Sequence, residues 1–241
     1  MLRTPIKAAT AIKAAAAVLA AGGMIAGCAP VQMGAAAIVG NRRISARQLS
    51  TQVSALSKAY KPYSGSVRLT SSQMPKQVLG WLIRFDVRED FARRAGITVS
   101  DSQAQQALAE IYSSATQQAQ QAGAGSVSLT ELAVANGLPP DMLSELGRYQ
   151  AIELAYIKRM NGGKLPASPA AVSTVTTQFN KAECQTYKSV AVKVNPQYGK
   201  LNYKQDSVVA APDTLSRAEG PSSKGSGASA AQGSSGQAPS C

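Results

Sequence analysis

Side chains able to do chemistry are few in this chain of 241 residues, which has 13 acidic residues, three cysteines and no histidine. Histidine is the usual proton shuttle near neutral pH and a common metal ligand. Its absence excludes a Ser-His-Asp triad, a Cys-His dyad and a histidine-ligated metal. No Ser-x-x-Lys motif occurs either, which removes the common serine–lysine arrangement. We therefore predict no catalytic residue, no metal ion and no cofactor.

Three carboxylates, Asp86, Glu89 and Asp90, stand close enough in sequence to suggest acid–base chemistry. Arg93 and Arg94 follow Glu89 and Asp90 at i, i+4 spacing, which on a helix pairs each acid with a base. Such pairs are typical of a solvated helix face. We expect a structural role for these carboxylates.

Cys28 is the cysteine with a definite chemical context. It follows Ile25-Ala26-Gly27, after a basic start and an Ala-rich apolar run from Ala14 to Ala21. The run is too short for a membrane span and has the layout of an export signal. An apolar residue, two small residues and a cysteine form the pattern of a bacterial lipobox. We predict that residues 1–27 are removed and that the Cys28 thiol is acylated, which anchors the chain to the extracytoplasmic face of the cell membrane.

The other two cysteines are Cys184 and Cys241. In an oxidising compartment they have one possible pairing if Cys28 carries lipid. The alternative is two free thiols. The sequence leaves both open.

The chain has 25 basic residues and a formal net charge of +12. Such an excess favours anionic partners, either nucleic acid or lipid headgroups. Three of the basic residues, Arg3, Lys7 and Lys13, belong to the predicted signal. Because an exported lipoprotein does not meet genomic DNA, we expect no nucleic acid partner. Contact with anionic lipid or wall polymer remains open.

The middle of the chain shows the periodicity of amphipathic helices. Ser45, Ser100 and Ser128 each have Gln or Glu three residues later, which is the capping-box signature. A further helix is predicted from about Pro75 to Ala95, and another opens at Pro139 and ends at Asn161. The sequence thus predicts about five helices.

Two segments have strand character instead. Residues 35–39 form a short apolar run before Gly40-Asn41, and residues 187–194 include alternating valines before Asn195-Pro196. Pairing of these segments would close the helices with a small sheet. We therefore predict a mainly α fold with a small sheet formed by the N-terminal and C-terminal strands.

The order of these elements resembles the N-terminal domain of the SurA family of extracytoplasmic chaperones. The most specific stretch is Ala92-Arg93-Arg94-Ala95-Gly96-Ile97-Thr98-Val99-Ser100-Asp101, and the resemblance covers about residues 35–160. Many relatives insert a parvulin-type isomerase domain of about a hundred residues. Only residues 164–186 separate the last predicted helix from the return strand, and parvulin sites typically use histidines. The resemblance therefore implies the chaperone module without the isomerase.

The resemblance implies a binding activity in which unfolded or nascent secreted proteins place apolar side chains in a groove between helices. Residues 81, 85 and 91 have the spacing of a buried stripe, so they could belong to the hydrophobic core or could line the groove. The candidate groove residues are Trp81, Phe85, Phe91, Ile111, Tyr112, Leu146 and Tyr149. The alternatives are a cell-envelope scaffold that binds one partner or wall polymer, and an isomerase relative without activity.

The predicted organisation ends in a Ser/Gly/Ala-rich tail that cannot bury enough apolar surface to fold. The predicted parts are a signal peptide (1–27), a tether (28–34), a folded domain (35–212, with helices in 41–162 and a return in 187–210) and the tail (213–241).

Overall fold

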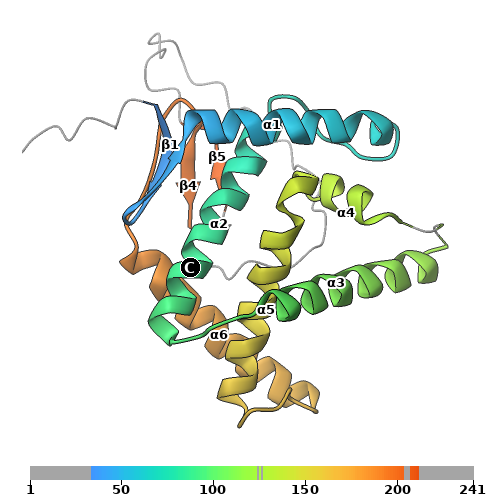
Figure 1. Cartoon of the computed structure of the whole chain (residues 1–241), viewed down its shortest axis with the longest axis vertical. Helices are drawn as coiled ribbons and strands as arrows, with labels where there is room; N and C mark the ends of the chain where they lie inside the picture. The colour runs from blue at the N-terminus through green and yellow to red at the C-terminus, as the bar shows by residue number, and fades with distance from the viewer. Residues whose placement is uncertain (1–33, 124, 126, 204–206, 212–241) are drawn as a thin grey trace, which may run out of the picture. The chain divides into compact units, whose positions relative to one another are not determined.

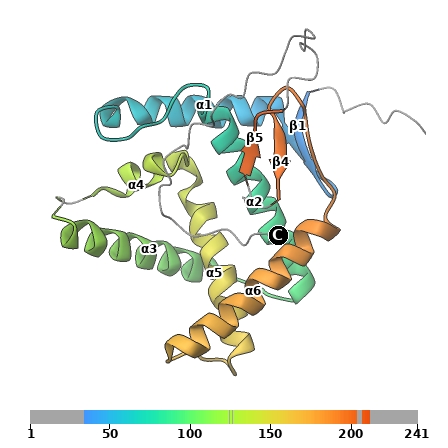
Figure 2. The same ribbon diagram turned by 180° about the vertical axis from the view of Figure 1, so that it is seen from behind.

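The computed structural model describes residues 34–123, 125, 127–203 and 207–211, and all of them belong to one compact unit that begins at Gly34. The predicted signal, Cys28 and the tail with Cys241 lie outside the described residues. The described elements are β1 (Ala35–Val39), β2 (Arg42–Ser45), α1 (Ala46–Tyr60), a 3-10 turn (Lys61–Tyr63), α2 (Met74–Ala95), α3 (Asp101–Gln121), α4 (Leu129–Ala135), a 3-10 turn (Pro140–Met142), α5 (Leu143–Met160), α6 (Pro169–Ser189), β3 (Val192–Val194), β4 (Lys200–Asn202) and β5 (Ser207–Val209). Figures 1 and 2 show their arrangement.

The helix starts follow the serine caps seen in the sequence. The Oγ atoms of Ser45 and Ser128 each accept a hydrogen bond from the backbone N–H three residues later, at 3.0 Å. Ser100 makes the full capping box, in which Gln103 Oε1 also accepts from the Ser100 N–H. Each cap satisfies backbone donors that the first helical turn leaves open.

A three-stranded sheet joins the two ends of the described domain. β1 is its central strand and pairs antiparallel with both β2 and β3, with Ala37 opposite Val194. β4 and β5 form a separate antiparallel pair. The sheet beside the helices confirms the predicted mainly α fold in which the N-terminal and C-terminal strands pair.

The C-terminal part of the helical region differs from the prediction. Residues 169–189 form a sixth helix, α6, and the strand is shorter than predicted because Tyr187 still belongs to that helix. The buried residues Val175, Phe179, Glu183 and Tyr187 explain why, since they recur every four residues as a helix requires. The alternating valines form β3 only from Val192 onward.

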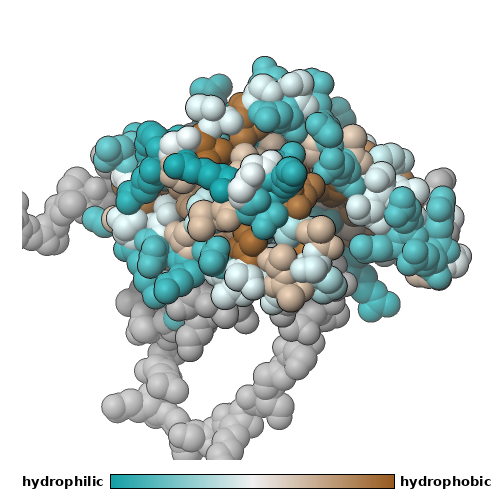
Figure 3. Space-filling model, turned by 90° about the horizontal axis from the view of Figure 1, so that it is seen from below, coloured by the Kyte–Doolittle hydropathy of each residue, from teal (hydrophilic) through white to brown (hydrophobic). Residues whose placement is uncertain are grey.

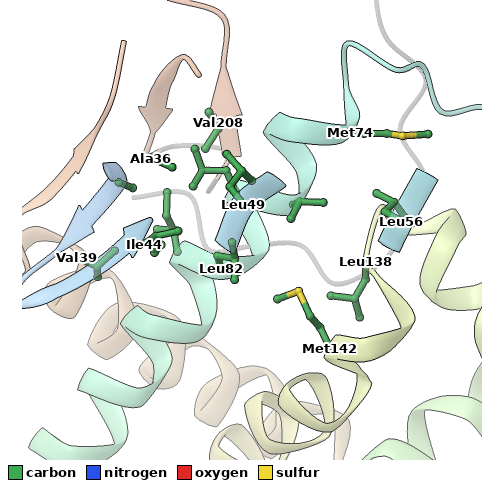
Figure 4. Close-up of a cluster of buried hydrophobic side chains, with 14 of the residues drawn as sticks. Ala36, Val39, Ile44, Leu49, Leu56, Met74, Leu82, Leu138, Met142 and Val208 are labelled. Carbon is green, nitrogen blue, oxygen red and sulfur yellow. The ribbon is translucent and has the colours of Figure 1, made fainter. Parts of the chain in front are cut away.

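Two hydrophobic cores hold the helices. The larger packs the sheet, α1, α2 and the start of α5, and Figure 4 shows Ile44, Leu49, Leu82 and Met142 among its members. The smaller contains Phe91, Ala92, Ile152 and Phe179, from α2, α5 and α6. None of the described helices is both long and apolar enough to span a membrane.

Candidate functional site

A cavity of about 220 Å³ lies between α1, α2 and α5. Gln48 and Gln52 of α1 line one side, and residues of α2 and α5 line the others. Concave sites that combine apolar and polar side chains are the usual places where proteins hold ligands. We therefore build the candidate site around this cavity.

Aromatic side chains form part of its lining. The Phe85 and Tyr149 rings lie 5.8 Å apart between centroids in an edge-on arrangement, and both residues line the cavity. Trp81 joins them, with its ring centroid 5.6 Å from that of Phe85 and 6.3 Å from that of Tyr149. The indole Nε1 of Trp81 donates to the Asn136 carbonyl at 3.0 Å, which fixes the ring. The three rings thus form one aromatic cluster whose arrangement is fixed before any ligand binds.

Charged side chains, most of them in ion pairs, form much of the rest of the lining. Arg42 Nη1 lies 2.8 Å from Asp86 Oδ1, which joins β2 to α2. Arg148 donates to both carboxylate oxygens of Glu89 and to the Val99 carbonyl, which joins α5 to α2 and to the segment before α3. The hydrogen bond to Glu89 is the main cause of a raised pKa for Arg148. The paired charges give the cavity a polar rim with little net charge.

Gln52 carries an unusual group. Its side-chain Oε1 is buried and accepts no hydrogen bond from any residue in the described part of the chain, and Gln52 lines the cavity. Buried acceptors are nearly always satisfied, so this oxygen is a position where a donor from water or a ligand could bind. A ligand that brings an N–H group would satisfy it.

Arg88 also lines the cavity, and its charged side chain is only 2% exposed. Its Nε donates to Glu183 Oε1 at 2.7 Å, and its Nη1 donates to the Tyr149 carbonyl at 3.1 Å and to Glu153 Oε2 at 3.3 Å. The guanidinium carbon lies 3.6 Å from the Tyr149 ring centroid and 4.6 Å from that of Phe179. One side chain of α2 thus binds both α5 and α6, and holds Tyr149 in place.

The surroundings of Arg88 keep it charged. Burial alone would lower its pKa, but Tyr149 and the carboxylates of Glu183 and Glu153 outweigh that effect and raise it. The charge therefore persists at every pH at which proteins fold. The carboxylates of Glu183 and Glu153 supply the negative charge that compensates this buried positive charge.

The structure brings together only some of the candidate groove residues. Trp81, Phe85 and Tyr149 form the aromatic cluster described above, and Leu146 packs against the larger core nearby. Phe91 lies apart, 3% exposed in the smaller core, where it contacts Tyr156 and Phe179.

The last two candidates, Ile111 and Tyr112, lie on α3, and neither lines the cavity. Ile111 is half-buried and Tyr112 is 36% exposed.

Two features of the site escaped the sequence prediction. Glu89 pairs with Arg148 of α5 and not with Arg93, which lies beside Asp90 together with Arg94. The reason is that Glu89 faces α5, where a bidentate partner is available. Arg88 was also missed, although one signal was present, since it continues the apolar stripe of Trp81 and Phe85 at helical spacing.

Cys184 lies half-buried on α6. Its pairing with Cys241 stays a prediction, because Cys241 is outside the described residues. Among the described residues, no cluster of acids and cysteines is placed to hold a metal ion.

Comparison with known proteins gives one match. A family model described as a SurA-like N-terminal domain matches residues 2–146, which is more than half of the 241-residue chain. The match runs from the predicted signal to the first turn of α5, so Tyr149, Glu153 and Glu183 lie beyond it. No curated protein and no solved structure matches.

Proposed function

The chain belongs to the family of SurA-like N-terminal domains, and on that premise we propose that it is a lipid-anchored extracytoplasmic chaperone that binds unfolded exported polypeptides. The family is chaperone-related, which favours binding of polypeptide over catalysis. Unfolded clients offer apolar side chains and unpaired backbone N–H groups together. The cavity carries the proposal, because it offers partners for both.

An apolar client side chain would pack on the Phe85–Tyr149 pair. Burial of apolar surface contributes about 25 cal/mol per Å², so one side chain in a cavity of about 220 Å³ gives weak and reversible binding. A backbone N–H of the same segment would donate to Gln52 Oε1. Neither contact selects a sequence, which suits a protein with many clients.

We expect the purified chain to delay the aggregation of an unfolded client at stoichiometric ratios, and Gln48→Trp to weaken this activity. Gln48 is exposed on α1 and lines the cavity, so the indole would block the cavity without disturbing the core. Phe85→Ala should weaken it as well, through loss of the apolar contact. Client affinity, measured by fluorescence anisotropy, should fall about fivefold or more for each variant, equivalent to about 1 kcal/mol.

Ser54→Trp is the matched control, since Ser54 is also exposed on α1 but does not line the cavity. It should leave client affinity unchanged. The proposal is to be dropped if the parent chain delays the aggregation of no client. If the parent is active but Gln48→Trp equals Ser54→Trp, the binding site lies elsewhere.

Client breadth separates the chaperone from a scaffold with one dedicated partner. Crosslinking in intact cells should capture many nascent secreted proteins, whereas a scaffold would capture one or two. We further expect no proline isomerisation of a short peptide, because the chain has no histidine.

Cys28→Ser tests the proposed anchor. Without the thiol no acyl group can be attached, so the protein should lose the acyl mass of the parent. After a high-salt wash, which weakens electrostatic contacts, it should move from the detergent-soluble membrane fraction to the aqueous fraction. Cys184→Ser is the control and should leave the distribution unchanged. An intact mass of the parent protein that shows no acyl group on the polypeptide would contradict lipidation.

A further inference from the structure

The turn between α5 and α6 exposes apolar side chains. Met160 is 47% exposed, Leu165 51% and Val172 45%. They are three of the five large hydrophobic residues that stand exposed in the described part of the chain. We call residues 158–172 the hairpin tip.

The hairpin tip is also basic. It contains Lys158, Arg159 and Lys164, and the wider segment 154–182 contains no aspartate or glutamate. Arg159 donates to the Ala95 carbonyl, at the end of α2. Within the described residues, Lys158 and Lys164 are exposed and no carboxylate lies within ion-pair distance of either. The tip thus combines exposed apolar side chains with uncompensated positive charge.

The position of the tip sets it apart from the cavity. Figures 1 and 2 place the turn between α5 and α6 at the end of the domain opposite β1. Figure 3, which views the molecule from that end, shows hydrophobic residues exposed among hydrophilic ones. The family match stops at residue 146, before the tip begins.

We propose that the hairpin tip is a contact site for a lipid bilayer with anionic headgroups. Apolar side chains that enter the interface, flanked by lysine and arginine that meet phosphates, are the features of interfacial membrane binding. Peptide ligands dock on sheet edges or in grooves, whereas residues 158–172 contain no strand and none of them lines the cavity. A second copy of the chain fits poorly, because two tips would bring like charges together.

This contact complements the proposed anchor without depending on it. One acyl chain combined with a basic patch binds a membrane more firmly than either alone. β1 begins directly after the predicted tether, at the end of the domain opposite the tip. Contacts at both ends would lay the described domain along the bilayer.

Co-sedimentation with vesicles tests the proposal. The sample is the chain from residue 28 onward with Cys28→Ser, which retains the whole compact unit from Gly34 and carries no acyl group. We expect binding to vesicles of equal parts phosphatidylcholine and phosphatidylglycerol to be at least about 25-fold stronger than binding to phosphatidylcholine alone, at low salt. The pair Lys158→Gln and Lys164→Gln should reduce it about tenfold or more, since each basic residue near an anionic surface contributes about fivefold.

The matched control is the pair Arg47→Gln and Lys58→Gln on α1, which removes the same charge from exposed positions elsewhere. It should change binding little. Equal loss in the control pair and the tip pair would mean that only net charge matters and would overturn the proposal. Equal binding to neutral and anionic vesicles would overturn it too.

Leu165→Trp reports the contact directly, against a parent whose only tryptophan is Trp81. Its emission should shift to shorter wavelength with anionic vesicles, as the indole enters the interface. No shift despite binding would overturn the proposal, as would a shift caused by an unfolded polypeptide and not by vesicles. No client is needed for the vesicle measurement, so its outcome is independent of the proposed chaperone activity.

Discussion

Glu183→Ala is expected to lower the free energy of unfolding by about 3–5 kcal/mol, because it leaves the buried guanidinium of Arg88 without its closest carboxylate. Both side chains are only 2% exposed and lie 2.7 Å apart. Glu153 cannot fully replace the lost partner, since it is 24% exposed and reaches Arg88 at 3.3 Å. Urea denaturation followed by circular dichroism measures the change.

The control is the double variant Arg88→Met and Glu183→Leu, which removes both buried charges. Apolar residues of similar volume often replace a buried ion pair with little change in stability. The partly exposed Glu153 carboxylate would then be hydrated, and the double variant should recover most of the stability lost in Glu183→Ala. A cost below about 1 kcal/mol for Glu183→Ala, or a double variant as unstable as the single one, would contradict the structural role assigned to Arg88.

The consequence for function is specific to Tyr149. Arg88 donates to the Tyr149 carbonyl and lies over its ring, so the ion pair also fixes one wall of the cavity. If the double variant is stable but binds clients weakly, Arg88 positions Tyr149. If it binds like the parent, hydrophobic packing alone holds the ring.

Local signals predicted the parts of the fold that depend on neighbouring residues. The caps at Ser45, Ser100 and Ser128 each involve atoms three residues apart, so the sequence alone located these helix starts. The β1–β3 pairing was also predictable, because two short apolar strands at the ends of a helical domain need a partner. Helix α6 was missed because no element was predicted for residues 164–186, and its last turn was taken for the start of a strand because of Tyr187 and the valines that follow.

Contacts between distant residues were not predictable from spacing. Arg88 and Glu183 are 95 positions apart, and Glu89 and Arg148 are 59 apart. An acid four residues before a base is a weak preference, and a bidentate partner on another helix overrides it. The aromatic cluster was found in part because Trp81 and Phe85 share one helix face, whereas Phe91 turns into the smaller core.

Gly147→Ala is expected to destabilise the protein although alanine favours helices. A Cβ at residue 147 would lie 2.4 Å from the carbonyl oxygen of Ala104 and 3.1 Å from Leu108 Cβ. The first is a backbone atom of α3, so α3 and α5 must move apart. Overpacking of this kind costs about 1–3 kcal/mol or more, which outweighs a gain of about 1 kcal/mol in helix propensity.

Gly80→Ala is the same substitution in a helix but causes no clash, so it should stabilise the protein instead of destabilising it. Gly80 lies buried in α2, and its added Cβ would meet no atom within 4 Å. We expect a gain of about 0.5–1 kcal/mol from helix propensity. In a domain of this size each kcal/mol shifts the melting temperature by about 2–4 °C, so calorimetry resolves both variants. Residues 104 and 147 belong to α3 and α5, so no loss of stability in Gly147→Ala would mean that these helices pack less closely than the structure has them. A loss of stability in Gly147→Ala together with a gain in Gly80→Ala would support the close approach of the two helices beside the cavity wall.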